Sequence, residues 1–298
     1  MTSAAGARVG RVSRHLTAAA SAPSVLIIGA SRGIGLGLVK SYAASGWTVH
    51  ATTRTPASPG ELGEIPGSVT LHACDITALD AGPSLSASLG DTTLDLVIYN
   101  AGINPKPEEG ASESRVMNTN GIAPFLVITP LLKHLAGQKK LALVSSQLGP
   151  APPPPPTTPP ASVPPRAKPT STPNQLPPPT HGNPPRWPCH QPGGPDAGGW
   201  LGAGSREAFG QGNIPEPIYH ASKCVLNDGF REQEPLWRER FGLTSIIFHP
   251  GWVITDMGGE NAEITVDESV EGMKSALEGV TAADTGKFLR WNGTEHPW

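Results

Sequence analysis

Short apolar runs alternate with amphipathic stretches along most of this chain. The first run, residues 24–28, is unbroken and rich in β-branched residues, as in a strand that is buried on both faces of a parallel sheet. Directly after it, apolar residues recur every four positions at Ile34, Leu38 and Tyr42, which is typical of the buried face of a helix. The pattern therefore predicts a strand that runs straight into a helix.

Similar apolar runs predict further buried strands downstream. They cover residues 48–53, 69–73, 94–99, 141–145 and 244–248. Strands that alternate with helical stretches are typical of the α/β class. We therefore expect a single Rossmann-type, doubly wound parallel sheet of six to seven strands, with right-handed crossovers and helices on both faces.

The turn between the first strand and its helix contains Gly29, Gly33 and Gly35. Such a turn has no side chains to block a phosphate, and the free N–H groups and positive dipole end of the next helix attract an anion. The spacing G-x-x-x-G-x-G predicts a dinucleotide pyrophosphate site. Glycines at this spacing also occur in ordinary tight turns, so the turn alone does not decide the function.

The residues that follow the second strand indicate which cofactor would fit. A site for NAD usually has an acid there for the ribose 2′-hydroxyl, whereas a 2′-phosphate requires arginine. Thr52 and Thr53 are not acids, Arg54 follows them, and Arg32 lies inside the glycine turn. We therefore expect NADP(H) to be favoured over NAD(H). The alternative is that both arginines are ordinary solvated surface residues.

Asp75 follows the third strand and lies at the edge where open α/β sheets bind ligands. Two roles remain open for it from the sequence. It caps the adenine amino group of the cofactor, or it caps the next turn of the chain.

Motifs further along the chain extend this pattern. Asn100-Ala101-Gly102 follows the fourth strand, Tyr219 and Lys223 form a Y-x-x-x-K pair, and a Pro250-Gly251 loop follows the sixth strand. Together with the glycine turn, these motifs resemble the short-chain dehydrogenase/reductase family. The endings DMGGENA and GKFLRWNGTEHPW are most similar to the branch with C-factor and the sniffer-type carbonyl reductases.

The resemblance implies a set of site residues. The implied catalytic residues are Asn120, Ser146, Tyr219 and Lys223. The expected cofactor-binding residues are Gly29, Ser31, Arg32, Gly33, Ile34, Gly35, Arg54, Asp75, Asn100, Ala101, Gly102, Tyr219, Lys223, Pro250, Gly251, Val253 and Thr255.

Chemistry gives reasons for several of these residue types. Tyrosine and lysine four positions apart share one face of a helix, so the Lys223 ammonium is expected to lower the pKa of Tyr219 toward working pH. Tyr219 would then serve as general acid and base. Ser146 would hold the carbonyl oxygen of the substrate, and Asn120 would support the proton path.

The composition is that of an enzyme-sized chain without an unusual charge. The chain has 298 residues and a net charge of −3, so nothing points to nucleic acid. No apolar run approaches a membrane span. The three cysteines are scattered, and four histidines, His134, His181, His220 and His249, have no partners at ligand spacing, so we expect no metal site.

One segment precedes the expected Rossmann domain of residues 23–298, and a second segment interrupts it. Residues 1–22 carry arginines and no acid, which is typical either of an organelle transit peptide or of an unstructured extension. Residues 150–204 form a proline- and glycine-rich insert between Ser146 and Tyr219, which we expect to be disordered. The insert is either a partner-binding arm or retained non-coding sequence, and we favour the second.

The motifs together predict an NADP-dependent carbonyl reductase or alcohol dehydrogenase acting on a small molecule. Two alternatives remain open: a cofactor-binding regulatory protein of the C-factor type, and an enzyme inactivated by the insert. The expected location is cytoplasmic, with organelle import as the alternative.

Pro235 is expected to kink or end the helix that carries Tyr219, and Gly229 to weaken it. Because this helix often packs across dimer interfaces in the family, a homodimer or homotetramer is possible.

Overall fold

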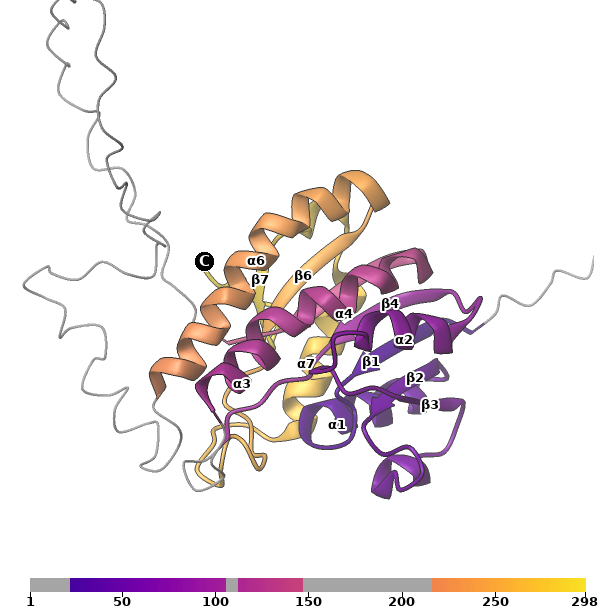
Figure 1. The fold of residues 1–298 in the computed structure, drawn as a ribbon, viewed down its shortest axis with the longest axis horizontal. Coiled ribbons are helices and arrows are strands. Elements are labelled where there is room, and N and C mark those ends of the chain that lie inside the picture. The colour runs from indigo at the N-terminus through magenta and orange to yellow at the C-terminus, as the bar shows by residue number, and fades with distance from the viewer. Residues whose placement is uncertain (1–21, 106–111, 147–215) are drawn as a thin grey trace, which may run out of the picture.

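Seven parallel strands pair in the order β3-β2-β1-β4-β5-β6-β7 in the computed structural model, which describes residues 22–105, 112–146 and 216–298 (Figure 1). The strands are β1 (Ser24–Ile28), β2 (Thr48–Thr53), β3 (Val69–Ala73), β4 (Leu94–Tyr99), β5 (Leu135–Val144), β6 (Thr244–His249) and β7 (Phe288–Arg290). The expected doubly wound parallel sheet of six to seven strands is confirmed. The strand order reverses between β1 and β4, which is the point where such sheets bind ligands.

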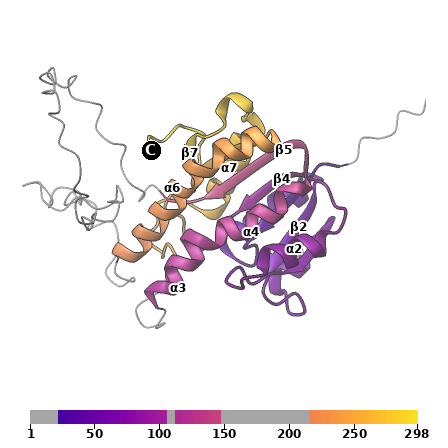
Figure 2. The ribbon, with the colours of Figure 1, turned by 45° about the horizontal axis from the view of Figure 1, so that its top comes forward.

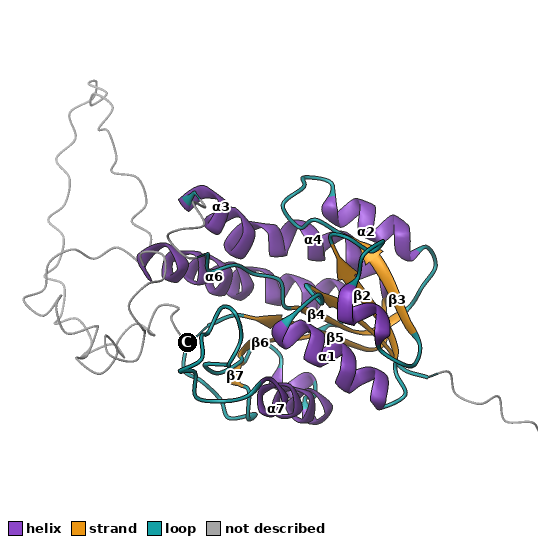
Figure 3. Ribbon diagram, turned by 90° about the horizontal axis from the view of Figure 1, so that it is seen from below, coloured by secondary structure: helices purple, strands orange, loops and turns teal. Residues whose placement is uncertain are grey.

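Helices cover both faces of the sheet, as Figure 3 shows with α2, α4 and α6 on one side and α1 and α7 on the other. The helices are α1 (Gly33–Ala44), α2 (Ala81–Leu89), α3 (Glu113–Met117), α4 (Ala123–Leu131), α6 (Glu216–Phe241) and α7 (Val266–Gly279). One π-helical turn, η3 (Asn118–Ile122), joins α3 to α4. Short 3-10 turns are η1 (Gly60–Glu64), η4 (Leu132–His134) and η5 (Ala282–Asp284).

The alternation of side chains along each strand divides the core into two layers. Val25 and Ile27 of β1 pack in the layer beneath α1 and α7, whereas Leu26 and Ile28 pack in the layer beneath α2, α4 and α6. All four side chains are fully buried. A continuous apolar run is therefore necessary in β1, because a polar residue at any of these positions would be buried without water.

Two strands differ from the expectation. β5 begins at Leu135 rather than at residue 141, and its register with β4 shifts near its start, where Gly137 and Lys139 have φ values of 57° and 49°. Such an irregular start breaks the apolar pattern by which the strand was predicted. β7 was not located individually, because it has three residues and depends on pairing with β6.

The expectation that Pro235 ends α6 is wrong, whereas the weakening expected from Gly229 stays a prediction. The helix continues through Pro235 to Phe241, because buried Phe230 and Trp237 fix the flanking turns against the core. A Cβ atom at Gly229 would lie 2.6 Å from the Phe125 ring of α4. Gly229 therefore permits the close approach of α4 and α6, which lie side by side in Figure 2.

The two segments outside the expected domain fall largely beyond the described residues. This applies to residues 1–21 of the N-terminal extension and to all of the insert at 150–204. Across the ranges that the structure describes, none of the helices combines the length and the apolar character that crossing a bilayer would require.

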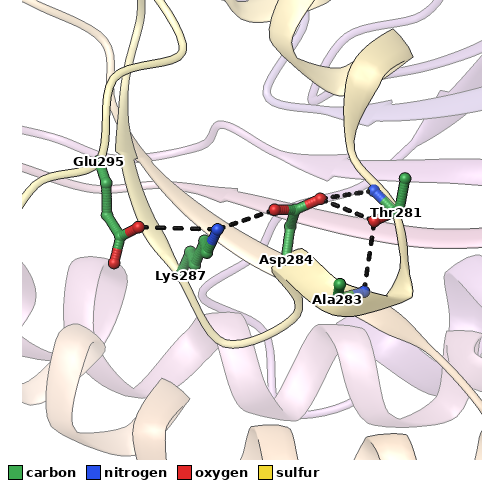
Figure 4. A network of polar contacts seen from close by, with 5 residues as sticks. All are labelled: Thr281, Ala283, Asp284, Lys287 and Glu295. Carbon is green, nitrogen blue, oxygen red and sulfur yellow. Dashed lines mark hydrogen bonds and ion pairs between the residues drawn. The ribbon is translucent and has the colours of Figure 1, made fainter.

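A small polar network anchors the chain before and after β7 (Figure 4). Thr281 and Asp284 form a capping box around η5, and the Lys287 ammonium lies 2.8 Å from Asp284 and 3.6 Å from Glu295. The hydrogen bonds from Lys287 and Thr281 hold the pKa of Asp284 well below its usual range. The network ties the last strand to the segment that follows it.

We predict that Gly35→Ala destabilises the fold by about 2 kcal/mol or more, because the new Cβ would lie 2.0 Å from the Gly29 carbonyl oxygen. Chemical denaturation measures the change. Gly279→Ala is the matched control, since nothing lies within 4 Å of its Cβ position, and it should be neutral or slightly stabilising. Equal stability of the two variants would contradict the steric argument.

Candidate active site

A cleft of about 420 Å³ opens at the carboxyl ends of the strands, above the point where the strand order reverses. It brings together most of the residues that the sequence predicted. Predicted residues that line it are Gly29, Ser31, Arg32, Gly33, Ile34, Arg54, Asp75, Asn100, Ala101, Gly102, Tyr219, Lys223, Pro250 and Thr255.

The glycine turn lines the cleft, and there is no room for a side chain at Gly29 or Gly35. A Cβ at Gly29, whose φ is +85°, would lie 2.6 Å from the Cα of Ala101. The Asn100 amide donates to the Gly29 carbonyl (2.9 Å), and the Gly29 N–H donates to Thr52 Oγ1 (2.9 Å). Three strand ends are thereby tied together at one point.

The N-terminus of α1 faces this floor without a local anion. Its first turn contains no acid, and the N-cap residue Arg32 makes no side-chain capping bond. The helix dipole and the first N–H groups therefore favour a bound phosphate. A dinucleotide cofactor fits this cradle, because the glycine turn leads directly into the N-terminus of α1 and its glycines add no side chains beside the N–H groups that would bind the pyrophosphate.

Three arginines, Arg32, Arg54 and Arg115, line the cleft. Arg32 Nη1 lies 3.0 Å from Asp256 Oδ2. Asp75 accepts hydrogen bonds from the Thr77 amide (3.0 Å) and hydroxyl (2.7 Å). These bonds, reinforced by Arg54 and Arg115, lower the pKa of Asp75.

Of the two roles expected for Asp75, the structure therefore contains the local one, a cap on the following turn. The same side chain lines the cleft, so a contact with adenine stays a prediction.

Tyr219 and Lys223 lie one turn apart on α6 and both line the cleft. The Lys223 ammonium is 5.7 Å from the centroid of the Tyr219 ring and donates to the Val144 carbonyl at 3.4 Å. Lys223 is buried. Tyr219 and Lys223 therefore share one face of the helix, as their spacing in the sequence predicted.

The expected lowering of the Tyr219 pKa is not found. Burial raises the pKa of Tyr219 to about 12 and lowers the pKa of Lys223 to about 8. The physical reason is that loss of water disfavours the charged form of both groups, and this outweighs their mutual attraction in the free protein. Tyr219 is consequently protonated at neutral pH in the free protein.

The two serines after β5 occupy different positions. Ser145 lines the cleft, and its hydroxyl donates to Asn227 Oδ1 at 2.6 Å. Ser146, the predicted active-site serine, is buried beside it, and its carbonyl accepts from the Asn227 amide at 3.5 Å. Asn227 on α6 thus fixes the strand end that carries both serines.

Asn120 does not line the cleft. Its side chain accepts from the Ile103 amide (2.8 Å) and donates to the Ile103 carbonyl (2.7 Å) and to Ser222 (3.0 Å). It lies within the π-helical turn η3. Its side chain therefore holds the segment after Gly102 in place beside α6.

The loop after β6 also contributes unequally. Pro250 and Thr255 line the cleft, whereas Gly251 and Val253 do not. Gly251 has a φ of +87°, and its Cβ would meet Ile264 at 2.4 Å, while Val253 bridges to Ile264 in parallel. Gly35 likewise supports the glycine turn without lining the cleft.

Sequence reasoning missed several residues of the cleft. They are Thr52, Thr53, Cys74, Ile76, Thr77, Ile103, Asn104, Pro105, Arg115, Thr119, Val144, Ser145, Asp256 and Met257. Thr119 is 3% exposed, and its hydroxyl has no protein partner among the described residues. Thr119 could have been predicted as a cleft residue because it is next to Asn120 in the sequence. No sequence motif near Arg115 or Asp256 marks them as cleft residues.

No group of three or more potential metal ligands occurs within the described ranges.

Comparisons with known proteins agree with this geometry. A family model described as short chain dehydrogenase matches residues 23–155. The chain is 39% identical over 80 residues to C-signal of Myxococcus xanthus, an alignment that covers 27% of this chain and about half (48%) of C-signal.

Two solved structures resemble the chain over most of its length. NADPH-bound carbonyl reductase from chicken fatty liver is 27% identical with a TM-score of 0.64, covering 93% of this chain and 99% of the other. Carbonyl reductase Sniffer of D. melanogaster is 22% identical with a TM-score of 0.62, covering 93% and 100%, and shares the fold.

We predict that stability rises with pH above about 8 because of Lys223. Its pKa is lowered to about 8 in the folded chain from 10.5, so between these values the unfolded chain binds more protons and the unfolding free energy increases with pH. Lys223→Met should remove a rise of at most about 3 kcal/mol between pH 8 and pH 10 in denaturant titrations. Lys133→Met, which alters an exposed lysine, should keep the rise. An equal pH dependence in all three proteins would contradict the prediction.

Proposed function

We propose that the chain is a member of the short-chain dehydrogenase/reductase family and acts as an NADP(H)-dependent oxidoreductase that interconverts a carbonyl and an alcohol. The observation that carries this proposal is the convergence of Tyr219 and Lys223 on the same cleft as the glycine turn. One end of the cleft is suited to phosphates, and the other end holds a phenol that can donate a proton.

The choice of NADP(H) is supported by the charges that line the cleft. Arg32 and Arg54 line the cleft. The hydroxyl of Thr52 at the end of β2 accepts a hydrogen bond from the Gly29 N–H of the glycine turn. Directly at the end of β2, where a site for NAD usually has an acid for the ribose 2′-hydroxyl, this chain has Thr53 and Arg54. The similar carbonyl reductase from chicken fatty liver was solved with NADPH. When bound, the cofactor would supply or accept the hydride.

Tyr219 would act on the oxygen of the substrate. With its pKa raised to about 12, the phenol stays protonated and can donate to a carbonyl oxygen as the carbonyl carbon gains a hydride. The product is then an alcohol, and the proton lost by Tyr219 must be replaced. Lys223, with a pKa near 8, is suited to stabilise the transient phenolate and to pass on a proton.

The neighbouring residues would position this chemistry. Ser146 is proposed to hold the substrate oxygen by a hydrogen bond, with Asn227 fixing the strand end. Asn120 is proposed to keep the segment after Gly102 in place, so that its part in the proton path is indirect. Substrate specificity would depend on the loop after Gly251.

A regulatory role is a second candidate, which the similarity to C-signal favours. In that reading the cofactor is bound and turnover is incidental. An enzyme inactivated by the insert is the third reading. Turnover of NADPH with a panel of aldehydes and quinones separates the first reading from the other two, which predict binding without turnover.

The proposed partner is a small carbonyl or alcohol, and the proposed assembly is a homodimer or homotetramer. Large apolar side chains are exposed along the neighbouring surfaces of η3, α4 and α6, namely Ile122, Leu126, Val225 and Leu236. Such a surface is suited to a second copy.

We predict that Tyr219→Phe lowers turnover by about two to four orders of magnitude and leaves NADPH affinity nearly unchanged, because the phenol acts on the substrate. Lys223→Ala should lose both activity and affinity. Steady-state rates and fluorescence titration measure the two effects. Tyr42→Phe, which removes a hydroxyl from α1 away from the cleft, is the matched control and should retain activity. Normal turnover in Tyr219→Phe would remove the proposed acid.

We also predict that NADPH binds about ten- to a hundredfold more tightly than NADH, which corresponds to the loss of one charge-assisted contact. Arg54→Asp should narrow or reverse this difference, since it replaces the guanidinium with the acid that a ribose hydroxyl prefers. Dissociation constants for both cofactors provide the measurement. Equal constants in the unaltered protein would refute the preference.

A further inference from the structure

An ion pair closes across the mouth of the cleft between two distant parts of the chain. Arg32 belongs to the glycine turn before α1, and Asp256 to the loop after β6. Their charged atoms lie 3.0 Å apart, both side chains line the cleft, and they remain 68% and 78% exposed. Among the described residues, Arg32 is the one cleft arginine with an ion pair within 4 Å.

Hydrogen bonds within the loop fix its backbone around Asp256. Thr255 Oγ1 accepts from the Gly258 amide at 3.0 Å, and the Gly259 amide donates to the Thr255 carbonyl at 2.8 Å. The Trp252 indole donates to the Gly258 carbonyl at 2.7 Å. These bonds make a compact turn with Asp256 at its tip.

The same turn lies against the glycine turn at a second point. A Cβ at Gly33 would lie 3.3 Å from the Thr255 methyl group. The two turns therefore approach each other through packing as well as through charge.

We propose that Asp256 is a cofactor-selectivity residue that competes with the 2′-phosphate of NADP(H) for Arg32. The inference rests on the proposed function. A phosphate monoester carries a charge of about −1.5 to −2 and accepts two parallel bonds from a guanidinium, so it outcompetes a single carboxylate. NADH carries an uncharged 2′-hydroxyl in place of the phosphate, and a neutral hydroxyl does not draw the guanidinium away from a carboxylate, so Arg32 stays on Asp256 when NADH binds.

The competition has a small and definite cost. An exposed ion pair of this kind stabilises by a fraction of a kcal/mol up to about 1 kcal/mol, which corresponds to about two- to fivefold in affinity. Asp256 therefore weakens NADPH binding by about this factor and leaves NADH binding unchanged. The ratio of NADH to NADPH dissociation constants is therefore smaller in the unaltered protein than it would be if Arg32 had no ion-pair partner.

The test is a double-mutant cycle on dissociation constants at low ionic strength. Asp256→Asn should tighten NADPH binding about two- to fivefold and leave NADH binding within about 1.5-fold. In the Arg32→Gln background, the same change should have no effect on NADPH. Glu260→Gln, which removes an acid from the same loop outside the cleft lining, should leave both constants unchanged.

The free protein gives an independent readout. Because the pair ties the loop to the glycine turn, amide hydrogen exchange in residues 255–259 should be faster in both Asp256→Asn and Arg32→Gln than in the unaltered protein. Unchanged exchange in both variants would overturn the inference.

Other outcomes are equally decisive. Equal tightening of NADPH and NADH by Asp256→Asn, or the same tightening in the Arg32→Gln background, would overturn the inference. Either result would mean that Asp256 acts only through its negative charge and not by competing for Arg32. Binding of neither cofactor by the unaltered protein would refute the proposed function as well. Binding with a clear NADPH preference but no coupling in the cycle would refute the selectivity role alone.

Discussion

The close approach of Gly29 to the end of β4 is the constraint on which the rest of the site depends. The Gly29 carbonyl accepts the Asn100 amide, its N–H donates to Thr52, and Ala101 fills the space where a side chain would stand. Three strands are therefore fixed relative to one another at their carboxyl ends. This arrangement points the N-terminus of α1 at the cleft and leaves its first N–H groups available to an anion.

Loss of water governs the chemistry at the opposite end of the cleft. The pKa of Tyr219 rises, that of Lys223 falls to about 8, and that of His249 falls to about 4, each mainly through burial. The protein thus holds an uncharged phenol next to a lysine that loses its proton easily. A cationic nicotinamide or a developing alkoxide would enter an environment with few competing dipoles, where each charge acts strongly.

Most of the fold was predictable from the sequence because parallel strands that are buried on both faces are rich in apolar and β-branched residues, as the run Val25 to Ile28 of β1 is. The glycine turn and the Tyr219–Lys223 spacing were predictable because their function depends on local geometry. The pairing of Asp256 with Arg32 was not, since it joins elements that only the folded sheet brings together. The part that Gly229 plays in helix packing was not predictable for the same reason, because the Phe125 ring that it accommodates lies on another helix.

The strand order also has a consequence for how the chain assembles during synthesis. The five strands from β3 through β5 are neighbours in the sheet, and all of them are complete by Val144, whereas β6 begins at Thr244. The first half of the chain can therefore form one continuous sheet on the ribosome while β5 is still an open edge. Until β6 covers that edge, its unpaired N–H and carbonyl groups are exposed to other chains. The time at which β6 leaves the ribosome thus sets how long a nascent chain is open to mispairing.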